Sequence, residues 1–585
     1  LRLGVLAYRK ILIDNCSGYD PLGKLTIAAV GHDLFMRQHM PADSIENLAR
    51  TYSRKDSAEE QQYISWLEHN LGYPLKRQFK VNQYSVDAYD KKTNIVYEYN
   101  GCCWHGGHGC SVCKMNPHAI NPVSNKPMHK MALETAARET SLKNLGFNVT
   151  SMSSCEYKQL ARTPEHKAFL TEYKRIAPIE KRDALFGGRT DLMRMYWRAR
   201  VAVLQAKTPE EHAQAMARYV DFTSLYPAML KYRDLPQGPH YKIQGPEAQK
   251  LDLRELIDTG ELGIVKADVY APRDLRCAVL PIHELETGKL IFPVGPKSGT
   301  WTTVELELAL EMGYTCERIH EAWMYKSKGR VFSGYIDTFL KLKQEASGKP
   351  AWVKTEADLD RYIREFEAHE GITLDRHKIS KNPGIRAVAK LYLNSLWGKF
   401  CQRETHLMTE THITNQPLNF FETLDNPCYA WESGQSNFEF TGAPGREKVY
   451  FQLQKHEDLA QGKCPNTNDI LGSFVTAHAR CALYRLLRDI GFEHVLYMDT
   501  DSAIYVESPE NAWIHKPTSE GGKLGDYLGE LTNELEGDGE HITEYVALAP
   551  KTYAYKTNLG NEVVKSKGFE LNHQNAQTIN FDGYK

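Results

Sequence analysis

Two aspartates, Asp499 and Asp501, are separated by one residue and lie between the apolar runs 495–498 and 503–506. Apolar runs of this length on either side of a polar turn predict a β-hairpin. Side chains two positions apart share a face, so both carboxylates are expected to project together. Such a pair repels itself unless a cation, most simply a divalent ion, lies between them. The turn therefore predicts metal chemistry, and a merely solvated acidic turn is the alternative.

A third acid, Asp221, is placed by its sequence at the end of a strand. The segment 218–221 is predicted to be that strand, and Tyr226 and Pro227 follow in a tight turn that the proline stops. An acid at a strand end with a constrained turn behind it is a second candidate for the same metal chemistry.

The segment 386–399 is predicted to be a helix with a polar stripe. Arg386, Lys390, Asn394 and Gly398 recur every four residues, which places them on one face. We expect Val388, Leu391 and Leu396 to pack inward. A solvated charged face is one interpretation. A stripe that mixes arginine, lysine, asparagine and glycine beside an aromatic residue is better suited to phosphates and a base.

Taken in chain order, these three segments resemble motifs A, B and C of the family B DNA polymerases. The family patterns are Asp-x-x-Ser-Leu-Tyr-Pro, Lys-x-x-x-Asn-Ser-x-Tyr-Gly and Tyr-x-Asp-Thr-Asp-Ser, and Trp397 replaces the tyrosine of the second. Lys551-Thr-Tyr553 resembles the downstream Lys-x-Tyr motif. The resemblance implies a DNA-directed DNA polymerase, a nucleotidyltransferase that extends a primer during replication of a virus, plasmid or transposon.

Finer features resemble the protein-primed branch of this family. The segment 182–190, with Gly187, Gly188 and Arg189, is similar to that branch's glycine-glycine motif, and 382–386, 476–480 and 528–532 also resemble it. The resemblance covers nearly all of 165–585 except an insertion, expected to be a long helix, at about 193–217. It implies template-primer DNA and deoxynucleoside triphosphates as partners, and a terminal-protein primer as a further one.

The family resemblance assigns a role to each motif residue. Asp221 and Asp501 are expected to hold two Mg²⁺ ions for nucleotidyl transfer, with Asp499 as a helper. The backbone at Ser224 and Leu225 should meet the triphosphate. Tyr226 should exclude a 2′-hydroxyl, or else be an ordinary packed tyrosine. The remaining nucleotide-binding residues implied are Arg386, Lys390 and Asn394, and the DNA-binding residues implied are Gly187, Gly188, Arg189, Lys551, Tyr553, Lys567 and Gly568.

Five of the 12 cysteines fall between 102 and 155, together with several histidines. Cysteines scattered elsewhere indicate a reducing compartment, where such a cluster is more often a zinc site than a disulfide framework. The expected ligands of a structural Zn²⁺ come from one set: Cys102, His108, Cys110, Cys113 and Cys155.

The region 55–160 resembles the very-short-patch mismatch endonuclease, within the Asp…Glu-x-Lys nuclease superfamily. The resemblance is carried by 101–105, a following cysteine, the segment 145–149 and Cys155. Paired strands at 84–89 and 94–101, around a turn that begins at Asp90, should bring Asp87 and Glu98 together, and His105 completes a candidate nuclease site. Asn100 departs from the superfamily's lysine. An inactive, zinc-stabilised module that contacts DNA is therefore preferred over a nuclease.

Composition sets wider limits on the chain. With 585 residues it has room for several domains, and its net charge of −2, from 72 basic and 74 acidic residues, does not itself indicate nucleic acid. No apolar stretch is long enough to cross a membrane and no signal peptide is recognisable, which predicts an intracellular protein in an unspecified compartment.

The expected fold is mixed α+β and multidomain: a right-hand polymerase plus a small α/β, restriction-endonuclease-like zinc-binding insert. The right hand would have a palm with an antiparallel sheet, helical fingers and a partial thumb. The expected segments are an exonuclease remnant at 1–50, to which no proofreading is assigned, the insert at 51–160, palm at 161–333, fingers at 334–400, a clamp-like insertion at 401–468, palm at 469–564 and the start of a thumb at 565–585.

Three rival interpretations remain. A reverse transcriptase also has a palm, but its two turn acids are normally adjacent, whereas Thr500 separates them here. A polymerase relic could serve as a catalytically inactive DNA-binding scaffold, although the acids and lysines of the motifs are intact. A nicking endonuclease would place the main activity in the insert.

Overall fold

The computed structural model describes 2–585 except 22–25, 43, 46–56, 74, 111–115, 122–123, 177, 200–215, 245–246, 285–286, 403–408, 415–428, 431–438, 442–447 and 456–466. The chain divides into two compact units, each with mixed α and β structure. The first unit comprises Leu1–Glu46, Ile179–Cys401 and Asn468–Lys585. The second comprises Asn47–Pro178 and Gln402–Thr467.

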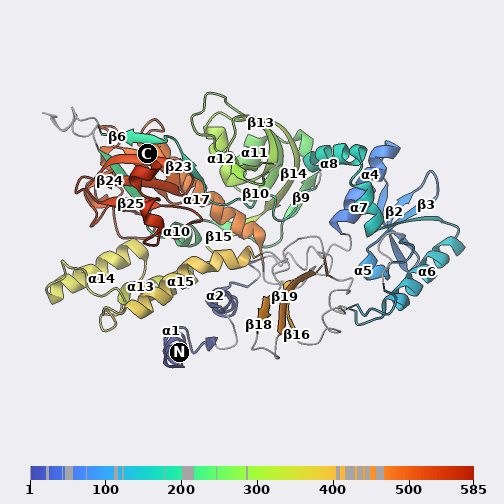
Figure 1. The fold of residues 1–585 in the computed structure, drawn as a ribbon, viewed down its shortest axis with the longest axis horizontal. Coiled ribbons are helices and arrows are strands. Elements are labelled where there is room, and N and C mark those ends of the chain that lie inside the picture. The colour runs from blue at the N-terminus through green and yellow to red at the C-terminus, as the bar shows by residue number, and fades with distance from the viewer. Residues whose placement is uncertain are drawn as a thin grey trace. The chain divides into compact units, whose positions relative to one another are not determined.

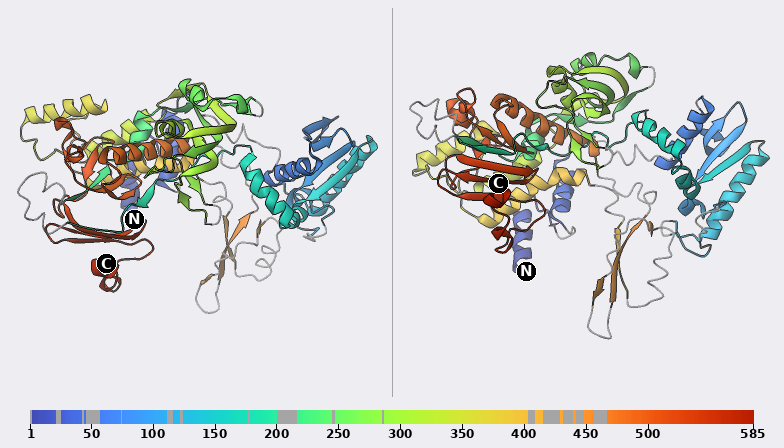
Figure 2. Two further views of the ribbon diagram at one scale, coloured as in Figure 1. Left: turned by 90° about the horizontal axis from the view of Figure 1, so that it is seen from above. Right: turned by 45° about the horizontal axis from the view of Figure 1, so that its top comes forward.

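The first unit is built on a nine-stranded sheet whose strands come from distant parts of the chain. Its main order is β25-β24-β23-β7-β21-β20-β5, with β22 beside β7 and β6 beside β23. Strands β6, β23, β24 and β25 of this sheet are labelled in Figure 1. The C-terminal strands, red in Figure 2, lie side by side. The bounds are β5 Thr190–Leu192, β6 Tyr196–Arg198, β7 Ala217–Phe222, β20 Val495–Asp499, β21 Ser502–Val506, β22 Leu531–Asn533, β23 Ile542–Ala549, β24 Thr552–Thr557 and β25 Glu562–Lys565.

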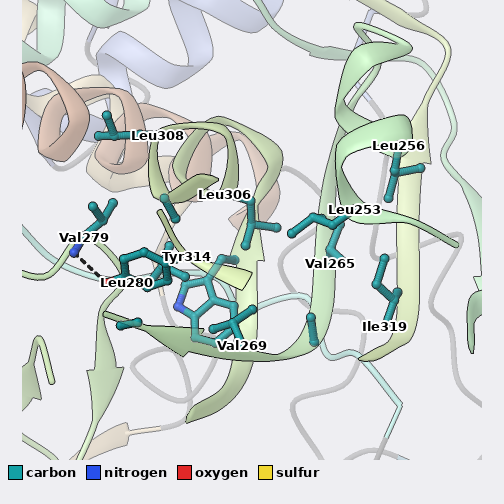
Figure 3. Packing of buried hydrophobic residues seen from close by; sticks show 14 of the residues in the cluster. Leu253, Leu256, Val265, Val269, Val279, Leu280, Leu306, Leu308, Tyr314 and Ile319 are labelled. Carbon is teal, nitrogen blue, oxygen red and sulfur yellow. Dashed lines mark hydrogen bonds between the residues drawn. The ribbon is translucent and has the colours of Figure 1, made fainter. Parts of the chain in front are cut away.

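A second sheet of this unit has the order β13-β10-β14-β9. Its strands are β9 Tyr241–Gln244, β10 Leu262–Ala271, β13 Gly295–Thr302 and β14 Thr315–Tyr325. Helices α11 (Leu253–Asp258) and α12 (Thr303–Glu311) contribute leucines to the same buried cluster as β10 and β14 (Figure 3). The hydroxyl of Tyr314 accepts a hydrogen bond from the Val279 N–H within it, at 2.9 Å. Burial of such side chains is the main stabilising contribution to this layer.

Three helices follow in sequence, α13 (Ser333–Glu345), α14 (Glu356–Glu370) and α15 (Pro383–Phe400), and all lie in the first unit (Figure 1). Helix α14 begins with a capping box between Thr355 and Asp358 and ends at Gly371, which has a φ of 69°. Helix α15 begins at Asn382, whose side chain accepts from the Ile385 N–H, with proline as its first residue. The buried residues of α15 include Ala389, Tyr392, Leu393, Leu396 and Phe400.

Other helices surround these elements. Helix α2 (Ile27–Leu34) contacts α15, and Tyr8 of α1 (Arg2–Asn15) forms a hydrogen bond with the Tyr392 hydroxyl. Helix α10 (Leu225–Tyr232) directly follows β7, and α17 (Asp469–Ile490) is buried along most of its length. The remaining bounds in this unit include β8 Leu235–Gln237, β11 Ile282–His283, β12 Leu290–Ile291, β15 Ser327–Gly329 and α18 Phe581–Tyr584.

The second unit contains a four-stranded sheet in the order β1-β2-β3-β4, in which β4 is parallel to β3. The predicted hairpin around Asp90 is confirmed, since β2 pairs antiparallel with β3. The strands are β1 Lys76–Val81, β2 Tyr84–Asp90, β3 Ile95–Asn100 and β4 Asn148–Ser153, and the helices are α4 Ala58–Leu71, α5 Cys102–His105, α6 Met128–Asn144, α7 Ser154–Leu160 and α8 Pro164–Ile176. The described strands of the later segment are β16 Thr409–Thr414, β17 Tyr429–Ala430, β18 Glu439–Thr441 and β19 Lys448–Lys455.

Several sequence expectations need correction. Residues 161–178, expected in the palm segment, belong to the second unit. The helix expected at about 193–217 is not present at 196–198, which form strand β6, and 200–215 lie outside the described residues. Within the segment 334–400, expected as helical fingers, the chain leaves the helical conformation between α14 and α15. Among the described residues, no helix is both long and apolar enough to cross a membrane.

Candidate active site

The three candidate acids meet at one end of the nine-stranded sheet. The predicted hairpin is confirmed, because β20 and β21 pair antiparallel with Asp499 opposite Ser502. Strand β7 pairs with β21 so that Asp221 lies opposite Ser502, and the Phe222 N–H donates to the Asp501 carbonyl at 2.8 Å. Two segments about 280 positions apart in sequence therefore share one site.

Backbone conformation at this site is unusual. Ser224, Thr500 and Lys551 have φ values of 53°, 58° and 63°, in the left-handed region that residues other than glycine rarely adopt. Such conformations cost free energy and persist only where surrounding contacts hold them. At Thr500 the holding contact is visible, since its N–H donates to the Arg189 carbonyl. One strained residue therefore lies in each of three separate motifs.

The electrostatic environment of the site is dominated by carboxylates. Burial, then the charges of Asp501 and Glu534, raises the pKa of Asp221 to about 8, while Lys390 opposes this shift. Burial, then the charge of Asp499, raises the pKa of Asp501 to about 6. Both shifts arise first from burial, and the positive charges of Lys390 near Asp221 and Lys551 near Asp501 offset them only in part. Bound divalent cations would supply further positive charge, so the donor set fits them.

Asp499 has a different environment from its two neighbours. Its carboxylate accepts from Lys551 Nζ at 2.6 and 2.8 Å and from the Thr190 hydroxyl at 2.9 Å. The Lys551 N–H in turn donates to the Tyr497 hydroxyl at 2.8 Å. A carboxylate that already has a cationic partner and a hydroxyl donor is suited to orienting the neighbouring metal ligands, which is the helper role expected of Asp499.

One acid of the site, Glu534, is absent from the sequence-based set. Thr532 lies opposite Asp221 in the pairing of β22 with β7, and its hydroxyl donates to the Asp221 carbonyl at 3.2 Å. Glu534 follows two positions later, and its N–H donates to the Tyr219 carbonyl. In the sequence, Glu534 follows Thr532 by two residues. This spacing indicates a site residue only once β22 is known to pair with β7.

Tyr226 lies against the residue that departs from the family pattern. Its ring centroid is 4.6 Å from that of Trp397, with an interplanar angle of 31°. Burial is the first cause that raises the pKa of Tyr226 to about 12. Pro227, expected to stop the turn, instead lies in the first turn of α10, where proline is tolerated. The aromatic pair joins the start of α10 to the last turn of α15.

The polar stripe of α15 is confirmed as an exposed face. Arg386, Lys390, Asn394 and Gly398 are all exposed, and the Arg386 Nε donates to the Ser347 hydroxyl at 3.2 Å. The inward face differs in part from the expectation. Leu391, expected to pack inward, is 50% exposed. The buried positions of this helix are instead Ala389, Tyr392, Leu393 and Leu396.

The glycine-glycine segment packs against the turn of the acids. A Cβ on Gly188 would lie 2.6 Å from the Thr500 side chain, which only glycine avoids. The Arg189 side chain was expected to bind DNA, yet it is 4% exposed and donates to the Ala278 carbonyl at 2.6 Å. Its guanidinium therefore supports the fold. Gly187 is exposed.

The residues expected near the primer separate into two groups. Lys551, Lys567 and Gly568 are exposed or half-exposed, as a DNA contact requires. Tyr553 is 4% exposed, and its hydroxyl forms a hydrogen bond with that of Tyr219 at 3.1 Å. The Tyr553 side chain, expected to bind DNA, is thus turned into the core by strand β24.

In the second unit, three cysteines converge. The sulfur atoms of Cys102, Cys110 and Cys155 all lie within 4.8 Å of one another, and those of Cys102 and Cys155 are 3.7 Å apart. His108 is not part of this group, since its Nε2 lies 3.5 Å from the Glu139 carboxylate. Cys113 lies outside the described residues. Three of the five expected zinc ligands are therefore brought together.

The candidate nuclease residues lie near this cluster but are engaged with other groups. The Asp87 carboxylate accepts from the Tyr99 N–H at 2.6 Å, and Glu98 accepts from Arg138 at 2.9 and 3.0 Å. Burial, then the charge of Asp87, raises the pKa of Glu98 to about 7. His105 Nδ1 lies 3.0 Å from the Thr135 hydroxyl. The positive charge beside Glu98 belongs to Arg138 of helix α6. It does not come from strand β3, where Asn100 stands at the position of the superfamily's lysine.

Part of the chain matches a known family. Residues 149–356 match the family model described as DNA polymerase type B, organellar and viral. This range includes Asp221 and Tyr226 and stops before Lys390, Asp499 and Asp501. No curated protein sequence matches the chain at a significant level.

Among solved structures, the chain is similar to Phi29 DNA polymerase. An orthorhombic crystal form is 18% identical with a TM-score of 0.42, over 71% of this chain and 58% of that one. A ternary complex with primer-template DNA and incoming nucleotide is 17% identical with a TM-score of 0.43, over 72% and 61%. The chain thus spans about three fifths of the length of these polymerases.

Proposed function

We propose that this chain, whose residues 149–356 match the model of the organellar and viral type B DNA polymerases, is a DNA-directed DNA polymerase. The proposal rests on the convergence of Asp221, on β7 inside the matched range, with Asp501, in the turn that precedes β21 outside that range; β7 and β21 are paired. Its substrates are deoxynucleoside triphosphates and template-primer DNA. A terminal-protein primer is a further proposed partner, supported by the motif around Gly187 and Gly188.

Two Mg²⁺ ions are the proposed cofactors of this site. Asp221 and Asp501 would hold them, because these two carboxylates have raised pKa values and their main neighbours are further acids. When bound, two such ions stabilise charge on the attacking and leaving oxygens of an in-line displacement at phosphorus. Asp499 and Lys551 would keep the turn in place from the other side.

The protein's own groups would then position the nucleotide. The N–H groups of Phe222 and Thr223 already donate to the Asp501 and Glu530 carbonyls. The backbone at the left-handed Ser224 and at Leu225 would therefore be the part of the turn that meets phosphate oxygens. Lys390 and Arg386 lie on the exposed face of α15 and would add positive charge there. Asn394 lies one turn further along the same face. Tyr226, whose ring packs against that of Trp397, would contact the sugar and exclude a 2′-hydroxyl.

The larger segments follow from the same proposal. Residues 179–333 and 469–564 would serve as the palm, 334–400 as the fingers, 401–468 as a clamp on template and primer, and 565–585 as the start of a thumb. Lys567 and Gly568 would contact DNA, as would Lys551. Residues 1–50, proposed as an exonuclease remnant, support α15 through α2.

In the insert, we propose that Cys102, Cys110 and Cys155 bind a structural Zn²⁺. Three sulfur atoms within 4.8 Å of one another are close to the spacing of ligands around one tetrahedral ion. A fourth ligand is required, and His108 or Cys113 is the candidate. The insert would be a restriction-endonuclease-like module that contacts DNA.

Cleavage by this insert is the less favoured proposal. Arg138 donates to both Glu98 oxygens, and the Asp87 carboxylate accepts from the Tyr99 N–H. Both acids therefore already have hydrogen-bond donors, which disfavours a metal ion shared between them. Nicking assays with Asp87→Ala and Glu98→Ala variants decide between the two possibilities. Loss of a measured nicking activity in both would restore the nuclease interpretation.

Template-directed primer extension by the full chain tests the main proposal. With Mg²⁺ and all four deoxynucleotides, the wild-type protein should extend a primer in the order set by the template, and Asp501→Ala should not. Glu311→Gln, a change at a partly exposed acid of α12, is the matched control and should extend normally. Equal extension by Asp501→Ala and the wild type would refute the assignment.

A further inference from the structure

A buried polar network connects α14, α10 and the loop that precedes β22. At its centre is Glu370, the last residue of α14, with a side chain 1% exposed. Its Oε2 accepts from Lys231 Nζ at 2.9 Å and from the Tyr232 hydroxyl, and its Oε1 accepts from the Leu528 N–H at 2.8 Å. One carboxylate therefore accepts hydrogen bonds from two other segments.

Lys231 is buried and contacts acidic and carbonyl oxygens of this network. It is 5% exposed, its Nζ donates to the Glu370 carbonyl at 2.7 Å, and the Asp337 Oδ1 of α13 lies 2.9 Å away. The neighbouring α14 residue His369 stacks on Tyr527 with ring centroids 4.0 Å apart. A buried charge pair is costly to break, because the partner left behind remains desolvated.

The loop held by Glu370 is joined directly to the turn after Asp221. The Gly529 N–H donates to the Thr223 carbonyl at 2.9 Å, and the Thr223 N–H donates to the Glu530 carbonyl at 2.8 Å. Strand β22 then continues from this loop and places Thr532 opposite Asp221. The path from Glu370 to the turn therefore consists of one side-chain hydrogen bond and a pair of backbone hydrogen bonds.

We infer that Glu370 is a positioning residue that fixes the 222–225 turn by holding Leu528 and α10 against the end of α14. This inference rests on the proposed function, in which that turn meets the triphosphate. It assigns α14 a task in nucleotide binding although α14 contributes no residue to the candidate site. The position of the helix end would thus be transmitted to the turn.

The test compares Glu370→Gln with two matched variants of the full chain. Glu365→Gln makes the same change at a residue of α14 that is 53% exposed, and Tyr232→Phe removes only one donor from the network. Hydrogen exchange of peptides covering 219–232 and 525–533 should be faster in Glu370→Gln and, to a lesser degree, in Tyr232→Phe. It should be unchanged in Glu365→Gln. Tyr232→Phe also decides the matter if Glu370→Gln does not fold.

Kinetics provide the second measurement. In single-nucleotide incorporation, Glu370→Gln should raise the KM for the deoxynucleotide by about 10-fold to 100-fold, the scale of a small misplacement, with unchanged affinity for primer-template DNA. Exchange and KM values equal to those of the wild type would overturn the inference. If the wild-type chain incorporates no nucleotide, the polymerase proposal fails, and hydrogen exchange still decides whether Glu370 fixes the turn.

Discussion

Thr500 shows how a single residue makes the acidic turn possible. A β-branched residue at a φ of 58° is strained, and the hydrogen bond from its N–H to Arg189 is one contact that stabilises this conformation. This conformation of Thr500 leaves Asp499 and Asp501 on either side of the turn. Asp499 pairs with Lys551, and Asp501 lies near Asp221. The two turn acids therefore acquire different environments.

The contact between Tyr226 and Trp397 leads to a prediction about sugar selection. Tyr226→Val should increase the use of ribonucleotides relative to deoxynucleotides by about 10-fold to 200-fold, because the smaller side chain no longer clashes with a 2′-hydroxyl. Competing incorporation of matched nucleotide pairs measures this ratio. Tyr226→Phe keeps the ring and should retain selectivity, whereas an unchanged ratio in Tyr226→Val would place discrimination elsewhere.

A second prediction concerns Gly188. Gly188→Ala should lower kcat by about 10-fold to 100-fold, because the new Cβ would lie 2.6 Å from the Thr500 side chain and displace the turn. Gly334 of α13 provides the control, since the nearest atom to a Cβ there is 3.6 Å away, an ordinary contact distance. Gly334→Ala should retain nearly normal turnover. Equal turnover by the two variants would show that the turn tolerates displacement.

Helix α15 shows what periodicity predicts and what it leaves out. The four-residue spacing of Arg386, Lys390 and Asn394 predicted one exposed face correctly, because helical geometry follows directly from spacing. The inward position of Leu391 was wrong, since burial depends on which neighbours cover the helix. The spacing of residues also does not show where α14 ends, because that end is set by the capping glycine Gly371.

At the scale of one element, the insert yields a prediction about metal. The full chain should contain about one zinc ion, and Cys155→Ser should lower this content, because it removes one of three converging sulfur atoms. Elemental analysis of purified protein measures this directly. Cys316→Ser, a change in β14 of the first unit, should leave the zinc content unchanged. Zinc-free protein whose insert is folded would mean that the three cysteines are packed thiols.

For the whole molecule, the central arrangement is a site assembled from sequence-distant strands. The resemblance to the family motifs implied that Asp221 and Asp501 would share a site, whereas the local patterns predicted only the strand and the turn on which each acid lies. Glu534 and the buried position of Arg189 were not predictable in this way. Their roles depend on which strand pairs beside β7 and on what covers the glycine-glycine segment, and both are long-range properties.

The most direct test of a metal site shared by the two acids is a single-turnover measurement. It compares Asp221→Asn, Asp501→Asn and the double variant, with Glu311→Gln as control. If both acids hold the same pair of Mg²⁺ ions, each single variant should lose several kcal/mol of transition-state stabilisation, on the order of 10³-fold in rate. The double variant should lose little more than either, because residues that act as a unit are not additive. Incorporation by Asp501→Asn within a few-fold of the wild-type rate, or fully additive losses, would contradict the shared site.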